Sequence, residues 1–198
     1  MEDLESDKSG CSSHDSDAYW EDTTLQHMGC LIDISLDFRS KEGIEISIKL
    51  LEKLLEKELT PAKEGTLYYF MANAWSSLKY LSRTEINQLW DSEHEEMEKE
   101  IIYLRRALKE RYFEEIPKFR KCQILTNLGN LMTEIGRFVE ALEYRNKAIS
   151  IDHSFAMAYG NKGYGIAWYS SALYDEGHKL GSSLISVGSQ VSLYTNSY

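Results

Sequence analysis

The sequence predicts an all-α fold, arranged as a right-handed helical solenoid of about four helix pairs, and three observations support this. Apolar residues recur at helical spacing along most of the 198 residues. Only 2 prolines and 12 glycines interrupt the chain, so long segments are able to form helices. Two segments around Gly129 and Gly163 are alike at a separation of 34 residues, which is a period of helix–turn–helix repeats.

The first segment, residues 1–18, is predicted to be a disordered acidic tail. It consists of Ser, Asp and Glu with almost nothing apolar, so it cannot contribute to a core. Residues 1–22 carry a net charge of −7 out of −10 for the whole chain. Phosphate binding needs clustered Lys and Arg, and the chain offers only the short cluster of Lys118, Arg120 and Lys121. No direct nucleic-acid partner is therefore expected.

The repeat region is expected to span residues 19–180, and its first two helices lie between Trp20 and Lys57. Apolar residues recur at helical spacing in the first helix, at Leu25, Met28, Leu31, Ile32 and Leu36. Ser40 can cap the second helix, whose apolar face begins at Ile44. That helix should end before Pro61, because the residue preceding a proline is disfavoured in the helical region.

A third helix is expected over residues 61–82 and a fourth over about 92–112. The third is unusually aromatic, and the fourth has a buried stripe that includes Met97, Ile101 and Leu104. The polar stretch from Ser82 to Glu96 separates them. Compared with the later repeat, this stretch is an insertion of about 15 residues.

The best-matched helices lie between Cys122 and Ser170. Small residues stand where the helices would cross, and glycine and an aromatic residue stand in the turn; these residues are Gly129, Gly163, Gly136, Phe138, Ala141 and Ala148. Two helices that approach closely need small side chains at the crossing. In these residues the chain resembles the tetratricopeptide repeat family. Asp152-His153 departs from the family, which has a proline at the second position, and a generic helical bundle is the alternative.

A wider resemblance concerns the runs 161–165, 174–178 and 68–75. In these runs the chain is similar to bacterial proteins in which such repeats precede a C-terminal HEPN domain, often a ribonuclease of defence and toxin systems. HEPN catalysis uses an Arg followed after four to six residues by a His, and this chain has no such pair. Ribonuclease activity is therefore not expected from this chain alone.

Residues 181–198 are predicted to be an atypical Ser-rich tail. They contain six serines and no charged residue. Leu184, Ile185, Val187, Val191 and Leu193 look strand-like, and the outer helix of a repeat should carry charges instead. The second helix of the last pair is therefore expected to be lost in this tail.

Stacked repeats leave a concave face, and we expect it to bind a peptide or helix of a protein partner. The predicted groove combines aromatic and polar side chains from the first helices of the pairs: Phe70, Ala74, Gln123, Thr126, Asn130, Glu134, Tyr164 and Trp168. Some family members clamp a terminal carboxylate there with lysines and asparagines. Asn130 and Asn161 match two asparagines, but Thr126 replaces a lysine, which argues against such a clamp. Ordinary packing between repeats is the alternative role for each residue.

No catalytic, cofactor or metal site is predicted, so the chain is expected not to be an enzyme. Cys11, His14, His27 and Cys30 could form a zinc site, but chance is the favoured explanation. The run 93–96 is interpreted as a solvated charged face, and Cys122 as a structural thiol rather than a reactive one. No membrane-spanning helix is expected, and three cysteines without close pairs favour a cytoplasmic location.

The sequence thus leaves two functional hypotheses. The first is a scaffold that binds a protein or peptide partner without catalysis. The alternative is the sensor or regulatory repeat region of a bacterial HEPN-type ribonuclease system. The oligomeric state is not predicted.

Overall fold

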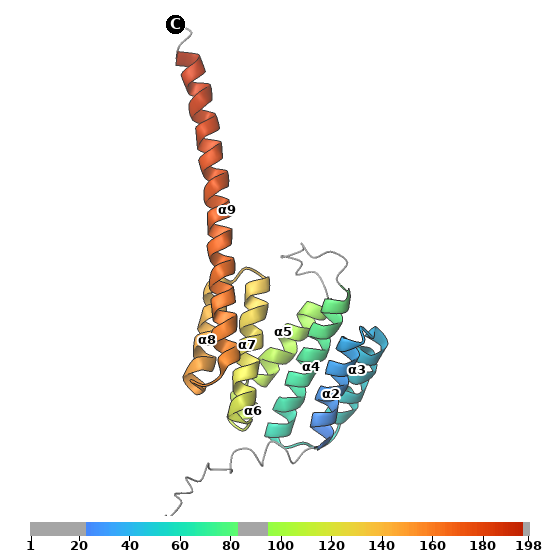
Figure 1. Ribbon diagram of the computed structural model, residues 1–198. Coiled ribbons are helices and arrows are strands. Elements are labelled where there is room, and N and C mark those ends of the chain that lie inside the picture. Colours follow the sequence, from blue (N-terminus) through green and yellow to red (C-terminus); the bar gives the residue numbers. More distant parts are fainter. Residues whose placement is uncertain (1–22, 83–94, 196–198) are drawn as a thin grey trace, which may run out of the picture. The chain divides into compact units, whose positions relative to one another are not determined.

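The computed structural model describes residues 23–82 and 95–195, and the described chain is helical apart from short connections (Figure 1). Eight helices follow one another in these ranges: α2 (Thr23–Asp37), α3 (Lys41–Leu55), α4 (Pro61–Ser82), α5 (Glu95–Ala107), α6 (Glu110–Phe113), α7 (Lys118–Glu134), α8 (Phe138–Ile151) and α9 (Ala156–Thr195). The all-α prediction is confirmed. The predicted acidic tail at 1–18 and most of the insertion at 82–96 lie outside the described residues.

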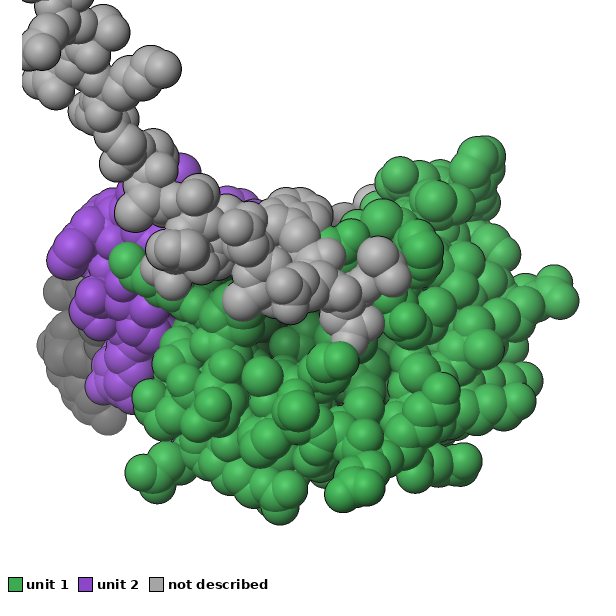
Figure 2. Space-filling model, turned by 90° about the horizontal axis from the view of Figure 1, so that it is seen from below, with its two compact units in different colours: residues 1–88, 92–124 green, residues 89–91, 125–198 purple. Residues whose placement is uncertain are grey.

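The chain divides into two compact units, coloured separately in Figure 2. Unit 1 comprises residues 1–88 and 92–124, and unit 2 comprises residues 89–91 and 125–198. Helices α2 to α6 belong to unit 1, and α8 and α9 belong to unit 2. The boundary falls within α7, between Ile124 and Leu125.

Unit 1 begins with the antiparallel pair α2 and α3, and its short turn follows from local chemistry. Arg39 has a φ of 53°, in the left-handed region that closes the turn after α2. Ser40 then caps α3, since its Oγ accepts a hydrogen bond from the Gly43 amide at 3.0 Å. Ile44 and Leu51 of α3 are completely buried. The predicted cap and the predicted apolar face of this helix are confirmed.

Helix α4 is the central element of unit 1 and packs against α2, α3, α5 and α6. It has the bounds that the sequence predicts. Gly65 allows α6 to approach closely, because a Cβ at this position would lie 2.9 Å from Cβ of Tyr112. Near its other end, buried Lys79 pairs with buried Glu100 of α5 at 2.7 Å.

The single helix expected over 92–112 is divided into α5 and the short α6. Lys109 between them has an extended backbone, with φ −61° and ψ 134°. The break turns Tyr112 inward, where its hydroxyl donates a hydrogen bond to Glu64 at 2.8 Å. Tertiary contacts with α4 thus outweigh the uninterrupted helical pattern of the sequence.

In unit 2, the crossing of α7 and α8 has the features that the repeat pattern predicts. A Cβ on Gly129 would lie 3.1 Å from the Ala141 carbonyl oxygen, so the small residue permits a close approach. Ala141 and Ala148 are completely buried. Gly136 lies in the turn between α7 and α8 and has a φ of 76°, a conformation that favours glycine.

Helix α9 differs from the prediction in two ways. It continues unbroken from Ala156 to Thr195, so the expectation of a strand-like segment after residue 181 is wrong. It also supplies no separate second helix for a fourth pair. No proline or left-handed glycine ends the helix, and β-branched residues lower helix propensity only slightly. Gly163 was expected to match Gly129, but a Cβ on Gly163 would have no described atom of another element within 4 Å.

Candidate functional site

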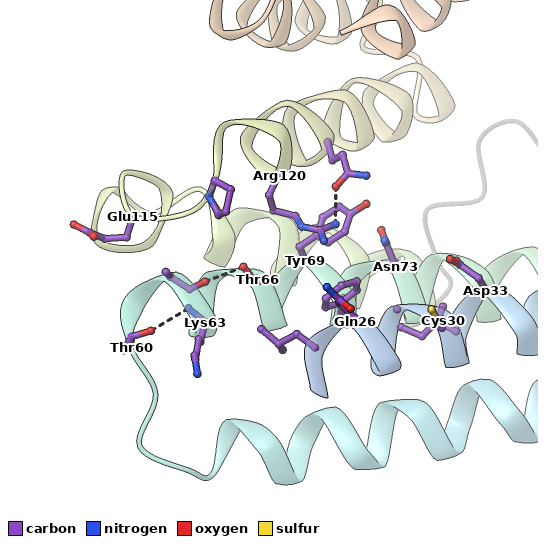
Figure 3. Close-up of a pocket in the computed structure, with 17 residues that line it drawn as sticks. Gln26, Cys30, Asp33, Thr60, Lys63, Thr66, Tyr69, Asn73, Glu115 and Arg120 are labelled. Carbon is purple, nitrogen blue, oxygen red and sulfur yellow. Dashed lines mark hydrogen bonds between the residues drawn. The ribbon is translucent and has the colours of Figure 1, made fainter. Parts of the chain in front are cut away.

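A cavity of about 690 Å³ lies within unit 1, between α2, the first half of α4, the segment that leads into α7 and the first turns of α7 (Figure 3). It is lined by apolar, aromatic, amide and charged side chains together. The lining residues are Leu25, Gln26, Gly29, Cys30, Ile32, Asp33, Thr60, Ala62, Lys63, Thr66, Tyr69, Phe70, Asn73, Glu115, Pro117, Arg120 and Gln123. Cavities of this size accommodate a small molecule or a few residues of a peptide.

The aromatic wall of the cavity depends on a close approach of α2 to α4. A Cβ on Gly29 would lie 2.8 Å from Cε1 of Phe70, so the ring occupies the space that a larger residue would take. Tyr69 packs edge-on against Phe70, with ring centroids 5.5 Å apart. Both rings are more than nine-tenths buried. The two rings of the wall are therefore closely packed against the neighbouring helices.

Arg120 is the one buried charged side chain among the described residues that line the cavity, and it is only 4% exposed. Its Cζ lies 4.2 Å from the centroid of the Tyr69 ring and 4.7 Å from that of Phe70. The positive charge is thus stabilised by the faces of two aromatic rings. Its Nη1 also donates a hydrogen bond to Oε1 of Gln123 at 2.6 Å, which fixes the direction of the guanidinium.

The remaining charged side chains stand at the exposed edge of the cavity. Asp33, Lys63 and Glu115 are all exposed, so water screens them more than it screens Arg120. Asp33 is nevertheless partly shielded from water by its neighbours, and this partial burial, together with the charge of Asp37, raises the pKa of its carboxyl above the ordinary value. Thr60 caps α4 at this edge, accepting a hydrogen bond from the Lys63 amide at 3.4 Å. The edge therefore carries charges of both signs, whereas the buried interior is positive.

The predicted groove residues of unit 1 have two different environments. Phe70 and Gln123 line the cavity, as a binding role requires. Ala74 is completely buried in the core. It therefore offers no surface to a partner, and its small size serves helix packing instead.

The other predicted groove residues belong to unit 2. Thr126 is completely buried, like Ala74. The Asn130 amide accepts a hydrogen bond from Arg145 at 3.2 Å, and Glu134 is half-buried. Exposed Tyr164 packs edge-on against Trp168, with ring centroids 6.1 Å apart. The predicted groove residues are therefore divided between the two units, and of all eight only Phe70 and Gln123, both in unit 1, line the cavity.

Sequence reasoning did not predict four of the polar and aromatic residues that line the cavity: Gln26, Tyr69, Asn73 and Arg120. Tyr69 was visible only as part of an aromatic helix. Arg120 was visible only as part of a short basic cluster, and nothing in that pattern separates one buried arginine from exposed neighbours. The signal that could have found it is its spacing from Gln123, since residues three apart share a helix face.

The possible metal and thiol sites gain no support. Cys11, His14 and His94 lie outside the described residues, and the described residues contain no group of three or more side chains able to hold a metal. Cys122 is completely buried, as expected of a structural thiol, whereas Cys30 is exposed at the edge of the cavity.

No protein-family model matches this chain, and no curated protein matches its sequence. Among the described residues, no helix is both long enough and apolar enough to cross a membrane.

Proposed function

We propose that this chain is a non-catalytic binding module, which holds a short peptide or a helix end of a protein partner in the cavity of unit 1. The observation that carries the proposal is the composition of the cavity wall. Tyr69 and Phe70 provide closely packed aromatic surface, while Gln26, Asn73 and Gln123 place polar amide side chains in the lining. Peptides present this same combination of apolar side chains and backbone amides, so the wall and such a ligand are complementary.

The proposal includes a tetratricopeptide-like arrangement of the helix pairs. It is supported by the close crossing of α7 and α8 at Gly129 and Ala141, and by the antiparallel pair α2 and α3. In such an arrangement the first helix of each pair faces the ligand. Helices α2, α4 and α7, which line the cavity, are first helices under the pairing α2–α3, α4–α5 and α7–α8. The HEPN hypothesis rests on the sequence resemblance alone, so the binding module is preferred.

Selective blocking of the cavity through Cys30 tests this proposal. In a Cys11→Ala background, a bulky maleimide should modify Cys30 and leave the buried Cys122 unmodified. Peptides are first selected from a random library with the untreated Cys11→Ala protein. The treated protein should lose the ability to capture them, because the adduct fills the cavity.

The matched control is the double variant Cys11→Ala/Cys30→Ala, which should capture the same peptides with or without maleimide. Bound peptide should also slow the modification of Cys30 in the single variant. Capture that survives complete modification of Cys30 would place peptide binding elsewhere and refute the proposal.

A further inference from the structure

The orientation of Gln123 determines what the interior of the cavity offers to a ligand. An arginine side chain can only donate hydrogen bonds, so the Gln123 atom that faces Nη1 of Arg120 at 2.6 Å must be the amide oxygen. The amide nitrogen, with its two hydrogens, consequently points away from this contact. The Arg120–Gln123 pair is therefore a source of donors and of positive charge.

The group that complements such a pair is a carboxylate. It accepts hydrogen bonds through both oxygens and carries the charge that a buried guanidinium attracts. Arg120 is also held in place by the rings of Tyr69 and Phe70, so little side-chain freedom would be lost on binding. A neutral amide of the same shape would gain less from this site, since it contributes no charge.

The charges at the edge of the cavity restrict the ligand further. Two acids, Asp33 and Glu115, are exposed there with one base, Lys63, so the edge carries one net negative charge, and the chain as a whole carries −10. These charges repel a polyanion such as RNA, whose phosphates would have to pass the edge. A single carboxylate that reaches the interior is compatible with them.

On these grounds we propose that the cavity recognises an acidic side chain, Asp or Glu, within a peptide, and that the Arg120–Gln123 pair receives its carboxylate. This inference rests on the proposed peptide-binding function and names the chemistry that the peptide must carry. Tyr69 and Phe70 provide the surface for an apolar residue beside the acidic one.

A random peptide library with fixed flanking residues, presented to the full chain, provides the probe. The selected peptides should share an acidic residue at one position. In synthetic copies with a blocked C-terminus, replacing this residue by its amide should weaken binding by about tenfold or more, as expected for a charge-assisted hydrogen bond. Blocking the C-terminal carboxylate should change nothing, which distinguishes a side-chain carboxylate from a terminal one.

The decisive protein variant is Gln123→Glu. It keeps the shape and the contact with Arg120 but replaces donor hydrogens by a negative charge, so it should weaken acidic peptides by about tenfold or more. Asn161→Asp, which adds the same charge on α9 in unit 2, is the control and should bind normally. Thermal unfolding of both variants checks that each is folded.

Different failures have different meanings. Peptides selected without an acidic residue, or bound equally by Gln123→Glu, would overturn the carboxylate inference while the peptide-binding proposal survives. Binding of poly(U) RNA in competition with the selected peptides would also overturn it. If the library yields no bound peptide, both proposals fail.

Discussion

At the scale of single residues, unit 1 contains a polar cluster whose charge state depends on packing. The Glu64 carboxylate accepts hydrogen bonds from the hydroxyls of Tyr68 at 2.7 Å and Tyr112 at 2.8 Å, and Arg111 lies 3.8 Å away. Burial alone would raise the pKa of Glu64. The two hydroxyls and the arginine outweigh it, so the pKa lies below its ordinary value of 4.5. Burial, together with the contacts with Glu64 and Tyr112, raises the pKa of the Tyr68 hydroxyl above its ordinary value.

This cluster predicts a pH-dependent contribution to stability. Because the folded-state pKa of Glu64 is lowered, its contribution is present above the unfolded-state value of about 4.5 and is lost as the pH falls through the folded-state value. Glu64→Gln should therefore lower the free energy of unfolding at pH 7 and have a smaller effect below pH 4. Urea unfolding at a series of pH values measures this difference. A difference that stays constant over this range would contradict the assignment.

At the scale of helices, α4 and α5 are joined by a buried ion pair. The side chains of Lys79 and Glu100 are 6% and 7% exposed, and their charged atoms are 2.7 Å apart. Both charges lose their water on folding, and this cost offsets much of their mutual attraction. The pair is therefore stabilising mainly relative to a protein in which one of the two charges is buried without the other.

Replacing one residue of the Lys79–Glu100 pair should therefore lower the free energy of unfolding more than replacing both. Lys79→Met should lower the free energy of unfolding by about 3–5 kcal/mol, whereas Lys79→Met/Glu100→Leu should recover most of that loss. As a control, Lys99→Met removes the more exposed pair with Glu95 and should cost less than about 1 kcal/mol. Denaturant unfolding of all three variants tests this. A double variant that is as unstable as Lys79→Met would show that the buried pair is not the cause.

A helix was predictable from sequence where the residues that determine its ends lie close to it in the chain. Helix α3 has an N-cap, an apolar stripe and a proline beyond its end, and all of these act within a few residues. The division between α5 and α6 was not predictable, because it depends on Tyr112 reaching Glu64, 48 residues earlier in the chain. The length of α9 was not predictable either, since residues of modest helix propensity do not by themselves end a helix.

At the scale of the whole molecule, the sequence indicated helix pairs but not the site that they form. Phe70 and Gln123 could be placed on first helices by their register, and both line the cavity. Arg120 could not be assigned, because its burial depends on aromatic residues that lie about 50 positions away in the sequence. Periodicity shows which face of a helix is apolar, whereas a cavity depends on how faces from several helices fail to fill the space between them.

The structure allows a more precise prediction of where the folded domain ends. The sequence placed the end of the repeat region at residue 180, and in α9 every residue from Leu173 to Lys179 is exposed. Packing of the described side chains against α8 therefore ends before the predicted boundary. A chain that stops after Leu180 should keep the unfolding free energy of the full chain to within about 0.5 kcal/mol. It should also lose the helical circular-dichroism signal of residues 181–195, since these residues are helical rather than strand-like. Urea unfolding and far-ultraviolet spectra of the two chains measure both effects. A loss of more than about 1 kcal/mol would mean that the last part of α9 is part of the folded core, since changes at exposed positions rarely reach that size.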